Sequence, residues 1–243
     1  MPKTTPYLIG AGVAVAAALA ALASYTATRP DAPTTSSVAV EQQTVVHPEP
    51  ERYARRDAKD PLAVGRADAP VVLIEYADFA CGYCGKFARD TEPALIEKYV
   101  DEGTLRIEWR NFPIFGAESE GAARASWAAG QQGRFRQFHR AAYAEGAKEK
   151  GFAEDRLLAL AREAGVADLA RFARDLDSAA ARRAVAEDQE QAYALGATST
   201  PSFLVNGRPI AGAQPMETFT AAIEAAKRDA AKRGAAKPAE AAK

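Results

Sequence analysis

The sequence of 243 residues holds only two cysteines, Cys81 and Cys84, and two residues separate them. Sulfurs at this spacing can form a reversible disulfide, supply half of a metal site or staple the chain. Tetrahedral zinc needs four ligands, and the two histidines, His47 and His139, are not paired at ligand spacing. A disulfide across so short a loop restrains the unfolded chain very little. The pair therefore favours redox chemistry, with no metal and no cofactor, and we assign His139 only a packing or surface position.

The residues around the pair predict a strand that leads directly into a helix. Residues 71–74 are a continuous run of apolar, mostly β-branched residues, which is typical of a buried central strand. A helical pattern follows over about 81–100, and Pro93 should kink or restart this helix. The free N–H groups at the helix start favour a thiolate, so the pKa of Cys81 should fall. Cys84, one turn later, could resolve a mixed disulfide, and we expect it to be more buried than an exposed Cys81.

The segment after this helix predicts a second strand. In "TLRIEWRNF" apolar residues alternate with Arg106, Glu108 and Arg110, which indicates one buried and one solvent-facing side. A strand, a helix and a second strand make a βαβ unit with a parallel pair. The predicted class is therefore α/β.

Helical sequence then fills about 117–195, before strand character returns in "SFLVNGRPIAG". Asn206-Gly207 is a turn signal for a two-residue hairpin, and Pro209 in its second arm indicates an edge strand. A last helix is predicted from about 215 to 226. Thr200-Pro201 precedes the first arm, and an X-Pro bond is where a cis peptide can occur. A cis bond there would present the Thr200 main chain beside the sulfur.

The two ends of the chain differ from this predicted domain. Residues 7–25 are apolar and uncharged, close to the roughly 20 residues of a membrane-spanning helix, and Ala21-Leu22-Ala23 also fits a signal cleavage site. We therefore predict a signal or membrane anchor over 1–28, a flexible linker over 29–59, the folded domain over 60–230 and a disordered basic tail over 231–243. Either leader places the domain in the cell envelope or outside the cell, where thiols become oxidised. The net charge of −1 gives no reason to expect nucleic acid as a partner.

Taken together, "VVLIEYADFACGYC", the helical stretch and "TSTPSFLVNG" resemble the DsbA-like thiol–disulfide oxidoreductases, over about residues 60–226. This resemblance implies a thioredoxin-like fold with an inserted α-helical subdomain. It implies that Cys81 is the nucleophile, Cys84 the resolving thiol and Pro201 a cis-proline, with Thr200 and Tyr83 contacting substrate. The resemblance also implies that Glu75 is a buried acid that accepts the Cys84 proton. Its place in an apolar run also favours burial, which would raise its pKa.

The resemblance leaves the direction of electron flow open. Gly82-Tyr83 stands between the cysteines where the strongest oxidants of this family carry Pro-His, and Tyr83 supplies no positive charge. We expect a less oxidising couple. The leading hypothesis is a monomeric dithiol oxidase that acts on exported proteins and is re-oxidised by a quinone-linked membrane partner. The alternatives are a reductase or isomerase that a membrane electron donor keeps reduced, and a non-catalytic binding module; the short polar linker, with no room for a dimerisation domain, argues against an isomerase.

Overall fold

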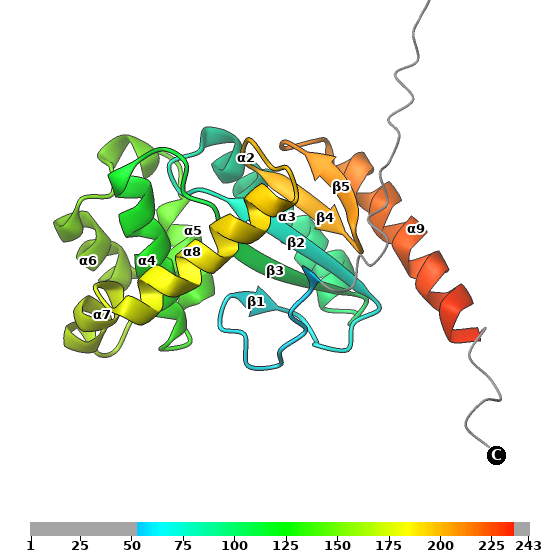
Figure 1. The fold of residues 1–243 in the computed structure, drawn as a ribbon, viewed down its shortest axis with the longest axis horizontal. Helices are drawn as coiled ribbons and strands as arrows, with labels where there is room; N and C mark the ends of the chain where they lie inside the picture. Colours follow the sequence, from blue (N-terminus) through cyan, green and yellow to red (C-terminus); the bar gives the residue numbers. More distant parts are fainter. Residues whose placement is uncertain (1–52, 236–243) are drawn as a thin grey trace, which may run out of the picture. The chain divides into compact units, whose positions relative to one another are not determined.

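A mixed β-sheet lies at the centre of the fold (Figure 1). In the computed structural model, which describes residues 53–235, five strands pair in the order β1-β3-β2-β4-β5. The parallel pair β2–β3 is the predicted βαβ unit, and the other pairs are antiparallel. The strands are β1 (Ala63–Val64), β2 (Val71–Ala77), β3 (Leu105–Asn111), β4 (Ser202–Val205) and β5 (Arg208–Ala211).

The C-terminal hairpin has the predicted form. Asn206 and Gly207 both have positive φ, at 44° and 82°, as a tight hairpin turn requires. Pro209 lies in β5, at the edge of the sheet, where its missing N–H breaks no ladder.

One face of the sheet packs against the helices that follow β2 and end the domain. These are α2 (Gly82–Asp90), α3 (Glu92–Leu95), a π-helical turn (Ile96–Val100) and α9 (Met216–Ala235). Pro93 lies in the first turn of α3, where a missing N–H is tolerated, so the restart predicted at this proline is confirmed. Phe87, Phe203 and Phe219 meet in the core of this face, with ring centroids 4.6–5.1 Å apart.

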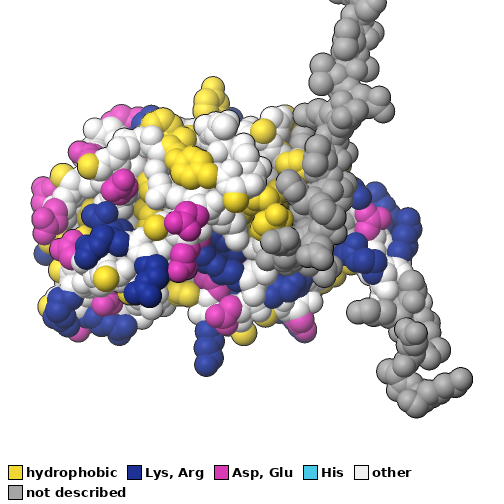
Figure 2. Space-filling model, in the orientation of Figure 1, with side chains coloured by type: hydrophobic (Ala, Val, Ile, Leu, Met, Phe, Trp, Pro, Cys, Tyr) yellow, Lys and Arg dark blue, Asp and Glu magenta, His cyan; other side chains and the backbone are white. Residues whose placement is uncertain are grey.

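A lobe of helices is inserted between β3 and β4, which confirms the predicted helical subdomain (Figure 1). Its core contains many alanines together with Phe138 and Phe172. Acidic and basic side chains are interspersed over its outer surface (Figure 2), as expected for the solvent side of amphipathic helices. Its elements are α4 (Ala117–Gly130), α5 (Phe135–Ala142), a 3₁₀ turn (Lys148–Lys150), α6 (Glu154–Glu163), α7 (Leu169–Leu176) and α8 (Ala179–Ala194).

The prediction that β3 has one solvent-facing side is wrong. Arg106, Glu108 and Arg110 are buried, because α8 and the chain just before β1 cover that side of the sheet. The Glu108 carboxylate accepts hydrogen bonds from the Arg106 and Arg110 side chains and from the backbone N–H groups of Arg55 and Arg56, each at 2.8 Å. Charges that alternate along a strand can therefore face a buried ion-pair network as well as water.

The ordered domain extends beyond both of its predicted boundaries, residues 60 and 230. Residues 53–59 lie outside the predicted domain but are bound to the sheet through Glu108, so the predicted linker is too long at this end. At the other end, α9 continues to Ala235, so residues 231–235 of the predicted tail are helical. Alanine, lysine and arginine are strong helix formers, which accounts for the extension.

The predicted leader over 1–28 lies outside the described residues. Within residues 53–235, none of the helices combines the length and the apolar character needed to span a bilayer.

Candidate active site

Asp78 fixes the connection between β2 and α2, where the cysteine motif begins. Its carboxylate accepts hydrogen bonds from the N–H groups of Ala80 at 2.8 Å and Ile114 at 2.7 Å. Its carbonyl oxygen accepts from the N–H of Cys81 at 3.0 Å and from the hydroxyl of Tyr143 at 2.8 Å. A local turn, the loop after β3 and the helical lobe thus hold the chain that presents Cys81.

Cys81 is the N-cap of α2, and Cys84 lies one turn further along the helix. The Cys81 Sγ accepts the N–H of Cys84 at 3.4 Å and donates to the carbonyl oxygen of Thr200 at 3.3 Å. Both cysteines are free thiols here. The prediction that Cys81 is exposed is wrong, because it is only 5% exposed, but the predicted order holds, since Cys84 is 0% exposed. Residues of the insertion and of the Thr200 loop close around the helix start.

The surroundings of Cys81 stabilise its thiolate. A hydrogen bond from the Cys84 thiol lowers the pKa of Cys81 most; burial opposes it, and the Thr200 side chain and the backbone N–H groups of Cys84 and Tyr83 lower it further. The result is a pKa of about 6, against an ordinary value of 9.0. The hydrogen bond that the Cys81 thiol donates to the Thr200 carbonyl favours the protonated form, but the hydrogen bonds that Cys81 accepts outweigh it and lower the pKa.

Cys84 has the opposite character. Burial raises its pKa well above the ordinary range, and the neighbouring Cys81 raises it further through both hydrogen bonding and charge. One sulfur of the pair is therefore largely ionised near neutral pH and lines a surface groove, while the other favours its protonated form in the interior. This asymmetry is what an attacking and a resolving thiol require.

Thr200 and Pro201 lie directly beside the cysteines. The peptide bond between them is cis, as the sequence suggested. The antiparallel pairing of β2 with β4 places this loop, just before β4, next to the end of β2 and the start of α2. The main chain of Thr200 therefore faces Cys81.

A groove of about 850 Å³ opens over Cys81. Its lining includes Tyr83, Phe115, Lys148 and Thr200. Tyr83 is 69% exposed and Phe115 is 57% exposed, which is unusual for large aromatic side chains. The sequence analysis did not identify Phe115 or Lys148 as site residues. For Phe115, the available sequence signal was its position two residues after Phe112-Pro113.

Glu75 is buried on β2, as predicted, with an exposed fraction of 1%. Neither of its carboxylate oxygens has a hydrogen-bond partner within the described part of the chain. Burial raises the pKa of Glu75 well above its ordinary value, and the charges of Glu92 and Cys81 raise it further. The surroundings of Glu75 therefore favour its neutral form, and Glu75 is electrostatically linked to Cys81.

The structure brings two residues to Glu75 that sequence reasoning missed or left without a role. Glu92 begins α3, and a glutamate before a proline there reads as an ordinary first helical turn. His139 is buried on α5, as a packing residue should be, but its Nδ1 lies 3.7 Å from the Glu92 Oε2. Nothing in the sequence indicates that residues 47 positions apart share one cavity with Glu75.

Comparisons with known proteins agree with this fold. The sequence model of the family described as Thioredoxin matches residues 57–225. A thioredoxin-like oxidoreductase from Silicibacter pomeroyi superimposes with a TM-score of 0.61 at 28% identity, covering 70% of this chain and 97% of that one. Oxidised BdbD from Bacillus subtilis superimposes with a TM-score of 0.65, covering 71% and 95% of the two chains; at 22% identity it supports the fold alone.

Two groups of curated relatives also match. The Na⁺/H⁺ antiporter NhaA 3 of Salinispora tropica is 35% identical over 175 residues, but these are 67% of this chain and only 24% of the antiporter. The chain thus spans about a quarter of the length of such relatives. A probable disulfide bond formation protein D from Bacillus cereus is 33% identical over 150 residues, which are 60% of this chain and 69% of that protein. The family model covers more than half of the sequence, and the chain therefore belongs to the thioredoxin family.

Proposed function

We propose that this protein is a dithiol oxidase of the cell envelope, which transfers a Cys81–Cys84 disulfide to pairs of thiols in exported proteins. The observation that carries the proposal is the opposite ionisation of the two cysteines. A thiolate at Cys81 stabilises the reduced form relative to the disulfide, and this makes a disulfide easier to give away. The likeness to a disulfide bond formation protein of Bacillus cereus supports the same direction.

The reaction begins with a thiolate of the substrate attacking the Sγ of Cys81. A mixed disulfide forms, the Cys81–Cys84 bond breaks, and Cys84 leaves as a thiolate that takes the proton of Glu75. A second substrate thiolate then attacks the substrate sulfur of the mixed disulfide, and Cys81 leaves as a stable thiolate. The substrate loses two electrons and the cysteine pair gains them.

The groove over Cys81 suits an extended peptide. Tyr83 and Phe115 offer exposed aromatic surface on its walls, and Thr200 offers main chain beside the attacked sulfur. We assign Tyr83, Thr200 and Pro201 to substrate positioning. Specificity for side chains would be low, because main-chain contacts and aromatic surface accept many sequences.

We also propose that residues 1–28 direct the protein to the envelope and that an oxidant of the membrane, such as a quinone-linked oxidase, restores the disulfide. The apolar residues 7–25 support the location. The same site could serve a reductase, and Gly82-Tyr83 between the cysteines favours that second candidate, because Tyr83 provides no cation to hold the thiolate. Thiol alkylation in whole cells separates the two: a mostly disulfide pair supports the oxidase, and a mostly dithiol pair supports the reductase.

Trapping of the mixed disulfide tests the chemistry. The oxidised wild-type protein should oxidise a peptide with two thiols, and Cys81→Ser should abolish this reaction. Cys84→Ser, pre-activated at Cys81 as a mixed disulfide with a small thiol, should accumulate a covalent complex with a peptide that carries a single thiol, and a reductant should release this complex. If Cys81→Ser oxidises the peptide as fast as wild type, the proposed function is wrong.

A further inference from the structure

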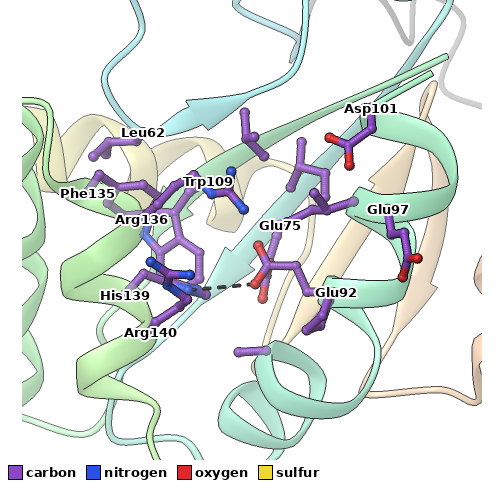
Figure 3. Close-up of a pocket in the computed structure, with 15 residues that line it drawn as sticks. Leu62, Glu75, Glu92, Glu97, Asp101, Trp109, Phe135, Arg136, His139 and Arg140 are labelled. Carbon is purple, nitrogen blue, oxygen red and sulfur yellow. Dashed lines mark ion pairs between the residues drawn. The ribbon is translucent and has the colours of Figure 1, made fainter. Parts of the chain in front are cut away.

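A second cavity, of about 220 Å³, lies among β2, α3 and α5 (Figure 3), and it shares no lining residue with the groove over Cys81. Glu75 from β2, Glu92 from α3 and His139 from α5 all line it. Its volume is enough for several water molecules, each of which occupies about 30 Å³ in the liquid. The cavity therefore connects the acid beside the cysteine pair with a different part of the surface.

The proposed reaction requires proton exchange at Glu75, at the inner end of this cavity. Cys84 and Glu75 are both buried, at 0% and 1% exposure, so a proton that moves between them cannot come directly from bulk water. Both oxygens of Glu75 lack a hydrogen-bond partner within residues 53–235, which leaves them available to water or to a second acid. A repeated reaction needs Glu75 to recover its proton after each turnover.

Glu92 occupies the position between Glu75 and the surface. Its side chain is 15% exposed, so it reaches both the interior and the solvent. Burial raises the pKa of Glu92 to about 7, although the charges of Arg136 and Arg140 oppose the shift. An acid that titrates near ambient pH can both take up and release a proton efficiently.

His139 holds Glu92 without fixing its charge. Figure 3 shows Glu92 reaching from α3 toward His139, and the rings of His139 and Trp109 pack edge to face with their centroids 4.9 Å apart. Burial and the charges of Arg136 and Arg140 lower the pKa of His139 to about 3, so the ring is neutral. A cationic histidine at this position would keep Glu92 ionised, whereas a neutral one lets Glu92 gain and lose its proton.

The charges at the mouth come from both walls. Arg136 and Arg140 of α5 flank His139, while Glu97 of the π-helical turn and Asp101 just after it lie on the other side (Figure 3). The two arginines attract hydroxide and repel hydronium, and the two carboxylates do the reverse, so the mouth presents both signs to solvent.

We propose that Glu92, positioned by His139, is a proton relay between Glu75 and solvent. When Cys84 leaves as a thiolate, Glu75 gives it a proton; the protonated Glu92 then gives its proton to the Glu75 carboxylate, directly or through water, and recovers one from solvent. When the disulfide forms again, the proton of Cys84 returns along the same route. This inference rests on the proposed function. It assigns the path by which protons pass between Glu75 and solvent, whereas the proton transfer between Glu75 and Cys84 belongs to the proposed function.

Repeated turnover tests the relay: a catalytic amount of the protein oxidises a fluorescent peptide with two thiols while glutathione disulfide regenerates the oxidised pair, with pH varied from 5 to 9. Glu92→Gln should slow this turnover about tenfold, less than the hundredfold or more expected for a group in direct contact with the reacting atoms. It should also abolish the inflection near pH 7 that we expect for wild type from the titration of Glu92. Glu97→Gln, on the rim of the same cavity, is the matched control and should keep the wild-type profile.

Two further variants separate a relay from a structural role. Glu92→Asp keeps an acid and should restore the inflection at least in part, while His139→Phe should keep the fold but shift the inflection, because Glu92 loses its polar neighbour. A Glu92→Gln profile that equals wild type from pH 5 to 9 overturns the relay, provided that wild type turns over normally. A wild-type protein that neither accepts nor donates a disulfide instead overturns the proposed function.

Discussion

Glu75 and Glu108 lie on neighbouring strands, β2 and β3, and both are buried, yet their surroundings differ in every respect. Glu108 accepts four hydrogen bonds, two of them from arginine side chains. Burial alone would raise its pKa, but these donors and the arginine charges lower the pKa to about 2. Glu75 has no such donors within the described residues, and burial with the nearby charges of Glu92 and Cys81 raises its pKa.

The two faces of the sheet therefore differ: one holds a buried ion-pair network, and the other holds the buried acid near the cysteines. On the side that α8 covers, acids and bases are matched, and the network binds the chain before β1 to the sheet. Asp188 of α8 extends it, since its carboxylate accepts the N–H of Asn111 at 2.9 Å and pairs with Arg55. On the side that carries α2, Glu75 has no hydrogen-bond partner within the described residues. The ionised Glu108, paired with arginines, stabilises the fold, whereas Glu75, which has no such pair, favours the protonated form.

The largest effect should come from removing the matched charge. Glu108→Gln leaves Arg106 and Arg110 buried without their acid, and breaking a buried pair in this way costs about 3–5 kcal/mol. Urea unfolding should show this loss in the free energy of unfolding. Glu75→Gln is the control: it replaces a neutral acid by a neutral amide of the same shape, so it should lower the free energy of unfolding by less than about 1 kcal/mol. Equal losses in the two variants would contradict the comparison.

The reaction should respond in the opposite way. Glu75→Gln removes the acid that we propose protonates Cys84, and loss of such a group slows the chemical step by about a hundredfold or more. Stopped-flow reduction of the oxidised protein measures this rate. Glu108→Asp, which retains the charge, should stay close to wild type. A Glu75→Gln protein with the wild-type rate would show that Cys84 obtains its proton elsewhere.

The two acids should also give stability opposite slopes with pH. Glu108 has a lowered pKa in the folded state, so its contribution is present above its unfolded value of about 4.5 and is lost as pH falls toward 2. Glu75 has a raised pKa, so its contribution is present below about 4.5 and is lost as pH rises toward its folded pKa.

Urea titrations of wild type and Glu75→Gln at several pH values isolate the second slope. Asp188 lies on the other side of the sheet and titrates equally in both proteins, so its effect cancels in the difference. The variant should gain stability relative to wild type as pH rises above about 4.5. A difference that stays constant with pH would mean that Glu75 is ionised in the folded protein.

The smallest effect concerns Thr200. Thr200→Val removes the hydroxyl that helps to lower the pKa of Cys81, so this pKa should rise, but less than in Cys84→Ala, because the Cys84 thiol makes the largest contribution. The pH midpoint of Cys81 alkylation measures both shifts. Thr198→Val, on the exposed part of the same loop, is the control. A larger shift for Thr200→Val than for Cys84→Ala would contradict the assigned causes.

The sequence predicted the parts of the fold and site that local pattern determines. The apolar run of β2, the helix start at Cys81, the Asn206-Gly207 turn and the X-Pro bond at Pro201 all depend on neighbours along the chain. Glu75 could be placed in the interior because apolar residues surround it.

The parts that the sequence did not predict depend on distant pairing. The charges of β3 are buried only because Arg55, Arg56 and α8 cover them, and no local pattern shows this. The cavity of Glu75, Glu92 and His139 likewise forms where three elements meet. Cys81 is less exposed than its place at a helix start suggests, because the Thr200 loop packs beside it.

The pKa of Cys81 in the reduced protein tests the central claim most directly. The rate of Cys81 modification by iodoacetamide, assigned by mass spectrometry and measured from pH 4 to 10, follows the thiolate population. The structure predicts a midpoint at about pH 6. A midpoint near 9, the ordinary value for a cysteine, would contradict the claim that this site holds an ionised sulfur ready for exchange.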